Sequence, residues 1–398
     1  MKRLTLGLIA FSLLMVSVNL LHAQYLTNGV VTTAVPFLRI SPDARAGGMG
    51  DLGVATSPDA NSSLYNLAKT PFSKHDYGIG LTYTPWLKDL GLNDVYLLSA
   101  AGFYKLDQNQ SLSASIRYFS LGNIQFTDYS GNTLGQGQPR EFGADFGYSR
   151  KLSDRLSVGL ALRYIHSNLA AGYASNGQTY KPGNAVAGDI SFYYNLANET
   201  TGQGWSFGLT LTNLGSKIGY TNDATQKDYI PASINLGTCY TAVFDEQNKI
   251  AFGVDLHKLL VPAPPAPDPS NNDTINNNNL IAYRDKSVVS SWFSSFSGGN
   301  QLQLIDVSLG AEYSYQDQFF VRVGYFYENA NQGDRKYFTA GVGLKYNVIG
   351  LNFSYLVPSG NGVTRNPLSN TIRFGLVFDL DNNSNSSGST TTPATTNQ

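Results

Sequence analysis

Apolar residues alternate with polar or small ones, with a period of two, along most of this chain. The pattern is clearest near the C-terminus, where Ile372, Phe374, Leu376, Phe378 and Leu380 occupy every second position. A β-strand points successive side chains to opposite faces, so this spacing predicts a strand with one apolar face. A chain built almost wholly of such strands, with apolar residues outward and polar residues inward, is typical of a transmembrane β-barrel.

The same alternation predicts about fourteen strands in all. Most have close to the ~9–11 residues that a tilted strand needs to cross a bilayer. They cover residues 77–86, 93–104, 110–121, 140–150, 154–166, 186–196, 204–213, 232–244, 249–258, 303–315, 318–328, 336–347, 349–357 and 370–380. We therefore expect an all-β fold, a transmembrane antiparallel barrel of about fourteen strands.

Charged residues within these strands fall on the face that the pattern turns inward. A charge that faced lipid at mid-membrane would cost ~2–4 kcal/mol, so this separation supports the barrel. The inward set is Arg117, Arg163, Asp255, Glu312, Arg322, Lys345 and Arg373. These side chains either satisfy one another in a polar lumen network or orient or gate a ligand. A barrel of this size is too wide for strand side chains alone to fill, so the N-terminal segment, water or a ligand must occupy the lumen.

Short and long connections alternate between the predicted strands, as they do in barrels with short periplasmic turns and long external loops. The long loops are 122–139, 167–185, 214–231 and 259–302. The last of these begins with a proline-rich, polyproline-like spacer. It then carries Trp292, Phe293 and Phe296, which either pack on their own barrel or form a partner-binding tip.

The two ends of the chain differ from the barrel pattern. Residues 1–23 combine Lys2 and Arg3 with an apolar stretch and a small residue, Ala23, which predicts a secretory signal peptide. Residues 24–76 precede the first strand and are long enough to enter the lumen as a plug. Residues 381–398 are rich in Asn, Ser and Thr, and we expect a disordered periplasmic tail. The predicted barrel is 77–380, and its last strand resembles the signal recognised in barrel assembly.

Composition narrows the class of protein further. The chain has 27 basic and 28 acidic residues, a balance that gives no reason to expect nucleic acid as a partner. After the signal segment no uninterrupted apolar run reaches the ~18 residues of a membrane helix. The 25 tyrosines suit interfacial aromatic girdles. Cys239 is the single cysteine, and we expect it to pack as a small apolar residue.

Motifs for chemistry are weak. Gly48, Gly50 and Gly53 match the dinucleotide-binding fingerprint, but that fingerprint needs a preceding buried strand. A turn-like run, 41–45, stands there instead. The histidines have no metal-ligand neighbours at usual spacing, and no nucleophile motif appears. We expect no catalytic residues, no metal and no cofactor, and so no enzyme.

One run of sequence resembles a known family. Residues 36–51 read Pro-Phe-Leu-Arg-Ile-Ser-Pro-Asp-Ala-Arg-Ala-Gly-Gly-Met-Gly-Asp, and 53–60 read Gly-Val-Ala-Thr-Ser-Pro-Asp-Ala. Both are similar to the PorV family of type IX secretion proteins in the outer membrane of Gram-negative bacteria. The family usually continues Trp-Asn-Pro-Ala-Lys, whereas residues 65–69 here are Tyr-Asn-Leu-Ala-Lys. The resemblance implies a FadL-like barrel of fourteen strands whose N-terminal segment plugs the lumen.

The resemblance also implies a role without catalysis. Such proteins receive secreted cargo bearing a C-terminal β-domain from a large translocon barrel and pass it to a cell-surface sortase. Outer-membrane lipid or lipopolysaccharide would surround the barrel. The alternative is a FadL-type transporter of hydrophobic small molecules. The inward positions are mostly Ser, Gly, Thr and charges, which favours the shuttle over a transporter that needs an apolar lumen.

Overall fold

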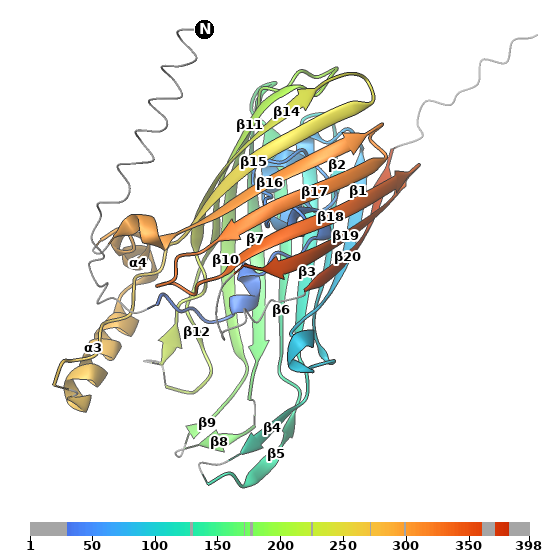
Figure 1. Ribbon diagram of the computed structural model, residues 1–398. Coiled ribbons are helices and arrows are strands. Elements are labelled where there is room, and N and C mark those ends of the chain that lie inside the picture. The colour runs from blue at the N-terminus through green and yellow to red at the C-terminus, as the bar shows by residue number, and fades with distance from the viewer. Residues whose placement is uncertain are drawn as a thin grey trace, which may run out of the picture.

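Fourteen antiparallel strands pair with their neighbours and close into a barrel in this computed structural model (Figure 1). It describes residues 30–381 except 128–129, 171, 176–177, 224–225, 271, 298–299 and 360–370. The predicted signal peptide, 1–23, and all but the first residue of the predicted tail lie outside this range. The barrel strands are β1 (Tyr77–Pro85), β2 (Val95–Lys105), β3 (Gln110–Leu121), β6 (Arg140–Lys151), β7 (Leu156–Asn168), β10 (Gly183–Asn195), β11 (Gly204–Gly215), β14 (Ser233–Val243), β15 (Asn248–Leu259), β16 (Ile305–Tyr315), β17 (Phe319–Tyr327), β18 (Lys336–Tyr346), β19 (Ile349–Pro358) and β20 (Ile372–Leu380).

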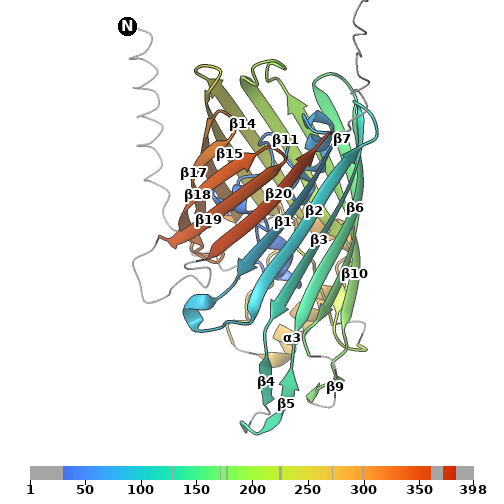
Figure 2. The same cartoon turned by 90° about the vertical axis from the view of Figure 1, so that its right-hand side faces the viewer.

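The predicted barrel and its strands are confirmed. Each predicted strand corresponds to one barrel strand, with its ends shifted by no more than a few residues. The barrel closes between the first and last strands, where Tyr77 pairs with Leu380 and Tyr83 pairs with Phe374 (Figure 2).

The two faces of the strands separate as the alternation predicts. In β7, Leu160 and Leu162 are exposed on the outside, whereas Arg163 is buried on the inside. Apolar side chains on the outer surface suit contact with lipid, and polar groups in the lumen keep charge away from it.

Residues 31–73 run through the barrel interior, seen in blue in Figures 1 and 2. Near the long loops, the Ala34 N–H donates to the Tyr229 carbonyl (2.9 Å). Near the short turns, Lys105 Nζ donates to the Ser73 carbonyl (3.1 Å). Short helical turns make up this lumen segment: η2 (Pro36–Arg39), α2 (Ala44–Gly47), η3 (Ser62–Leu64) and η4 (Leu67–Phe72). The segment therefore spans the lumen from the external mouth to the periplasmic end.

Apolar packing holds the outer end of the lumen segment. Phe37 and Leu38 of η2 pack in a buried cluster with the ends of the surrounding strands. The Phe37 and Phe119 rings are stacked with centroids 6.5 Å apart, and Trp86 meets Phe119 edge to face at 6.2 Å. Side chains of the segment and of the wall thus pack together on this side of the mouth.

The external loops carry structure of their own. The described parts of these loops contain three small hairpins: β4 (Ile124–Thr127) with β5 (Thr133–Gly137), β8 (Ala174–Ser175) with β9 (Gln178–Thr179), and β12 (Ile218–Gly219) with β13 (Lys227–Asp228). The β4–β5 hairpin projects beyond the barrel at the bottom of Figure 1. A further turn, η5 (Lys88–Leu90), joins β1 to β2.

The loop between β15 and β16 holds helices that the sequence pattern did not predict. They are α3 (Asp273–Asp285), α4 (Val288–Ser294) and the turn η6 (Gln301–Leu304). The Asn272 side chain caps α3 by accepting from the N–H groups of Thr274 (3.0 Å) and Ile275 (3.2 Å), which satisfies donors that a helix start leaves free. Within the described residues, none of the helices is long and apolar enough to cross a membrane.

Candidate functional site

The inward charges of the barrel wall bind mainly to the lumen segment. Glu312 accepts from Arg45 of α2 through two hydrogen bonds, at 3.0 and 2.7 Å. The same carboxylate accepts from Arg322 Nε at 2.6 Å. Arg45 also pairs with Asp59 (2.8 Å). A carboxylate of β16 therefore joins the lumen segment to β17, and each buried charge has an opposite partner.

Three more of the predicted inward residues bind backbone groups or a carboxylate of the lumen segment. Asp255 accepts from the N–H groups of Gly53 (2.7 Å) and Val54 (2.8 Å). Arg117 donates to the carbonyls of Leu38 (3.1 Å) and Leu64 (2.9 Å). In addition, Arg373 Nη2 lies 3.3 Å from Asp51 Oδ1. Charged side chains of the wall thus supply hydrogen-bond partners for backbone groups of the lumen segment that have no partner in a helix or strand.

The remaining two predicted residues have partners on other strands. Arg163 pairs with Asp145 and Asp189, the latter at 2.8 Å. Lys345 pairs with Asp379 at 2.6 Å, beside His75 at the periplasmic end.

Within the described residues, Glu312 and Arg322 form the one direct hydrogen bond that joins two of the seven predicted residues. Arg45 and Asp51 were not among the residues predicted to form the lumen network. Both residues lie in the segment that was expected to enter the lumen, and this position could have identified them as partners of the wall.

Burial and neighbouring charges shape the electrostatics of the lumen segment. Burial opposes the charge of Arg45, but Glu312 and Asp59 outweigh it and hold the pKa of Arg45 well above its ordinary value. Burial lowers the pKa of Lys69 to about 8, and Asp59 only partly offsets this. Lys69 Nζ donates to the Gly53 carbonyl (2.7 Å) and to Thr56 Oγ1 (3.1 Å), so it ties η4 to the glycine-rich run.

The glycine-rich run serves close packing against the wall. A Cβ on Gly324 of β17 would lie 2.1 Å from the backbone nitrogen of Gly50, and a Cβ on Gly341 would lie 3.1 Å from the Cα of Gly48. Gly50 also has φ of 68°, in the region that favours glycine. Backbone therefore meets backbone here. Since Gly48 lies at the end of α2 rather than after a strand, the context of a dinucleotide fingerprint is missing.

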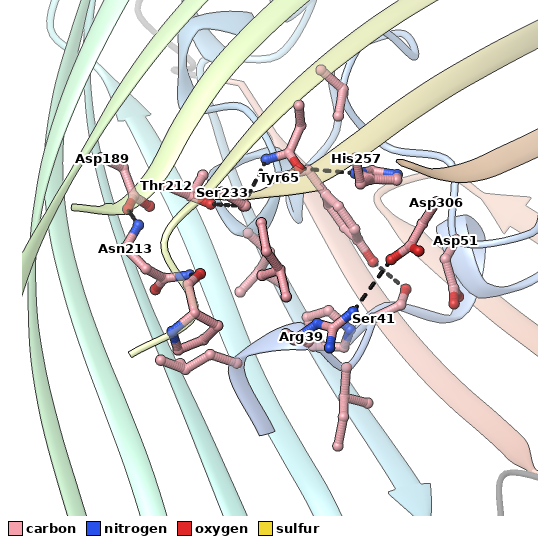
Figure 3. A pocket seen from close by; sticks show the side chains of 18 of the residues that line it. Arg39, Ser41, Asp51, Tyr65, Asp189, Thr212, Asn213, Ser233, His257 and Asp306 are labelled. Atoms are coloured by element: carbon pink, nitrogen blue, oxygen red, sulfur yellow. Dashed lines mark hydrogen bonds and ion pairs between the residues drawn. The ribbon is translucent and has the colours of Figure 1, made fainter. Parts of the chain in front are cut away.

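A cavity of about 150 Å³ lies between the outer half of the lumen segment and the wall (Figure 3). Most of the residues that line it have polar or charged side chains, and apolar residues such as Leu38 and Phe326 complete the lining. The Tyr65 hydroxyl lies 2.6 Å from Ser41 Oγ, and Arg39 Nη2 donates to Asp306 at 3.3 Å. Within the described residues, no group of three or more His, Cys, Asp or Glu is arranged to hold a metal ion. Cys239 is buried and unbonded to another cysteine.

The external face presents two different surfaces. The β4–β5 hairpin is a two-stranded sheet, so each of its strands has an outer edge that joins no other described strand. The predicted partner-binding residues lie in and after α4, where Phe293 is 74% exposed, Phe296 is 52% exposed and Trp292 is half-buried. The hairpin follows β3 and α4 follows β15, six places apart around the fourteen strands, so the two lie on opposite sides of the barrel (Figure 1).

Comparison with known families decides the assignment. The family described as type IX secretion system protein PorV matches residues 23–266. The chain belongs to the PorV family. As a PorV-family barrel it is a component of the type IX secretion system in the outer membrane of a Gram-negative cell, and the family associates with secreted cargo. No curated protein matches the sequence significantly.

Solved structures similar to this PorV-family chain are outer-membrane barrels. The Pseudomonas putida toluene transporter TodX is 10% identical with a TM-score of 0.50, over 85% of this chain and 98% of TodX. A TodX mutant described as a monoaromatic hydrocarbon channel is 12% identical with a TM-score of 0.50, over 84% and 97%. A Pseudomonas aeruginosa FadL homologue is 11% identical with a TM-score of 0.47, over 88% and 99%. At these identities the likeness concerns the fold.

Proposed function

We propose that this protein is a non-catalytic shuttle that binds the C-terminal β-domain of secreted cargo at its external face. Cargo would arrive from a translocon barrel and leave to a cell-surface sortase. The observation that carries the proposal is the projecting β4–β5 hairpin, which offers strand edges to a β-rich partner. Adding a strand to an exposed edge is a common way to bind an extended segment, because the backbone supplies the hydrogen bonds.

The base of the hairpin is well anchored for this role. The Leu121 N–H donates to the Pro139 carbonyl (3.0 Å) where the hairpin leaves the barrel. Near its middle, the Phe126 and Tyr173 rings lie 4.0 Å apart, and the Tyr173 hydroxyl donates to the Gln136 carbonyl (2.7 Å). The neighbouring external loop thus fixes the hairpin in position, which lowers the entropy lost when a partner binds.

The filled lumen supports a binding role over transport of hydrophobic solutes. Arg39, Arg117 and Arg163 line the cavity beside Asp189 and Asp306. A hydrophobic solute would leave such charged groups without water, which is costly. The alternative transporter reading therefore has less support here than the shuttle.

The test is replacement of residues 124–137 by a short Gly-Ser turn in a strain without the native gene. We expect cargo bearing the C-terminal β-domain to lose its surface attachment. The matched control replaces Lys88–Leu90 of η5, another external turn, with a Gly-Ser sequence of equal length. Cells with this variant should secrete cargo normally. Both variants must reach the outer membrane in wild-type amounts. Normal cargo display by the hairpin variant would refute the proposed contact.

A further inference from the structure

The segment that follows α4 packs on the outer side of the barrel wall. On β15 the alternate residues Phe252, Val254 and Leu256 are exposed on the lipid-facing side. Lys258 is the next residue on that side, yet it is only 8% exposed. Its ammonium donates to the Ser295 carbonyl (3.0 Å) and lies 5.0 Å from the centre of the Phe296 ring. The end of α4 therefore covers a position that would otherwise meet the membrane.

In α4 the polar residues are buried and the apolar residues are exposed, the opposite of a helix that packs on a protein core. Ser291 and Ser295, four residues apart, are buried toward the barrel. Val289, Phe293 and Phe296 follow at helical spacing and are all more than half exposed. A short helix that turns its small polar residues to the protein and its apolar residues outward needs another apolar surface to cover it.

The position of α4 along the barrel suits the membrane–water interface. Lys258 pairs in register with Ile305, which lies two residues before Val307 in β16, and Val307 pairs with Tyr327. Tyr327 pairs in turn with Lys336, whose ammonium lies 5.4 Å from the Tyr327 ring centre. Aromatic and basic residues at the outer end of the apolar band are the pattern found where lipid headgroups begin.

We propose that α4 and the turn after it lie in the outer leaflet, with Val289, Phe293 and Phe296 among lipid acyl chains. Continuity with the lipid-facing band of β15 and β16 selects lipid as the occupant. The helix acts as an interfacial anchor that widens the barrel on this side. Lys258 lies beneath the helix, and Lys286 precedes it on the exposed surface, where a cation suits anionic headgroups. The assignment does not depend on cargo binding.

The chain allows a direct test, because its three tryptophans, Trp86, Trp205 and Trp292, have different environments. Trp205 is exposed on the outer wall and Trp86 is buried in the lumen cluster. A reporter carrying F293W with W86F, W205F and W292F is placed in phosphatidylcholine vesicles whose acyl chains bear bromine near the headgroup. We expect its fluorescence to be quenched to a similar extent as a variant that keeps Trp205 alone. A variant that keeps Trp86 alone should be unaffected.

Two outcomes would overturn the proposal. One is that brominated lipid does not quench the fluorescence of the reporter, whereas soluble iodide does. The other is that a purified cargo domain protects the reporter from quenching by iodide and lipid does not. That result would make α4 a protein-binding surface. Heat-modifiable migration in gels verifies that each variant is folded. If the fourfold variant fails to fold, the W86F/W205F variant reports from the natural Trp292 with the same expectations.

Discussion

Arg45 in the lumen segment and Glu312 in β16, 267 residues apart, bind through two parallel hydrogen bonds deep in the barrel. Glu312→Ala leaves Arg45 and Arg322 without their shared carboxylate. Removing one partner of a buried ion pair typically costs ~3–5 kcal/mol. We expect a lower unfolding temperature and earlier protease cleavage within 36–76. Asp317→Asn, which removes a pair with Lys249 at the exposed end of the barrel, should change stability by ~1 kcal/mol or less. Equal effects of the two substitutions would contradict the key role of Glu312.

The contact between Gly324 and Gly50 leaves no space for a side chain. A Cβ at position 324 would lie 2.1 Å from the backbone nitrogen of Gly50, so Gly324→Ala must displace the lumen segment. We expect a higher ion conductance in planar bilayers than that of the native protein. Gly350→Ala is the control, because its Cβ would meet only Val377, at 3.5 Å. A Gly324→Ala barrel with the conductance of the native protein would show that the segment can shift without opening a path.

Lys69 provides a prediction for pH. Its pKa in the folded protein is about 8, below the ordinary 10.5. Between these values the unfolded chain retains the proton that the folded chain has lost, so this group makes stability rise as pH increases from about 8 to 10.5. Lys69→Met should remove that contribution and flatten the curve of unfolding free energy against pH in this window. The measurement is urea unfolding in detergent at several pH values. Parallel curves for the variant and the native protein would contradict the assignment.

Lys217 clamps the helical loop to the barrel. Its ammonium donates to the carbonyls of Arg284 and Lys286 and lies 4.5 Å from the centre of the Tyr229 ring. Lys217→Met removes these contacts, so trypsin should cut after Arg284 and Lys286 several times faster. Lys181→Met is the control, since Lys181 bonds Asn222 elsewhere on the external face. Unchanged cleavage would show that the Tyr229 hydroxyl, bonded to the Tyr283 and Lys286 carbonyls, is sufficient.

The strands were predictable because a wall with lipid on one side and a polar lumen on the other imposes a period of two. Arg163 and Leu162 illustrate this, since one lies inside and the other outside. The helices of 259–302 were not predictable in the same way. The run Asn276–Asn279 lies within α3, although asparagine is a weak helix former. The helix is held instead by its Asn272 cap and by contacts such as that of Arg284 with Asp228, which depend on the fold.

The partners of the inward charges were also not predictable from the sequence. Spacing places Asp255 in the lumen, but its partners are the backbone N–H groups of Gly53 and Val54, about 200 residues away. No periodic pattern marks such contacts, because the lumen segment is irregular. Only the expectation that 24–76 entered the barrel pointed toward them.

The path of the lumen segment constrains the order of folding. Ala34 lies at the external mouth, whereas Tyr77 begins the wall at the opposite end and pairs with Leu380, the last residue of β20. The sheet thus closes around a segment that precedes all of its strands. Threading residues 31–73 into a finished cylinder would require passage of charged Arg45 and Arg39 through a closed ring. We infer that the segment collects its wall contacts while the sheet is still open, and that the β1–β20 seam forms last, as the pairing with the largest separation in sequence.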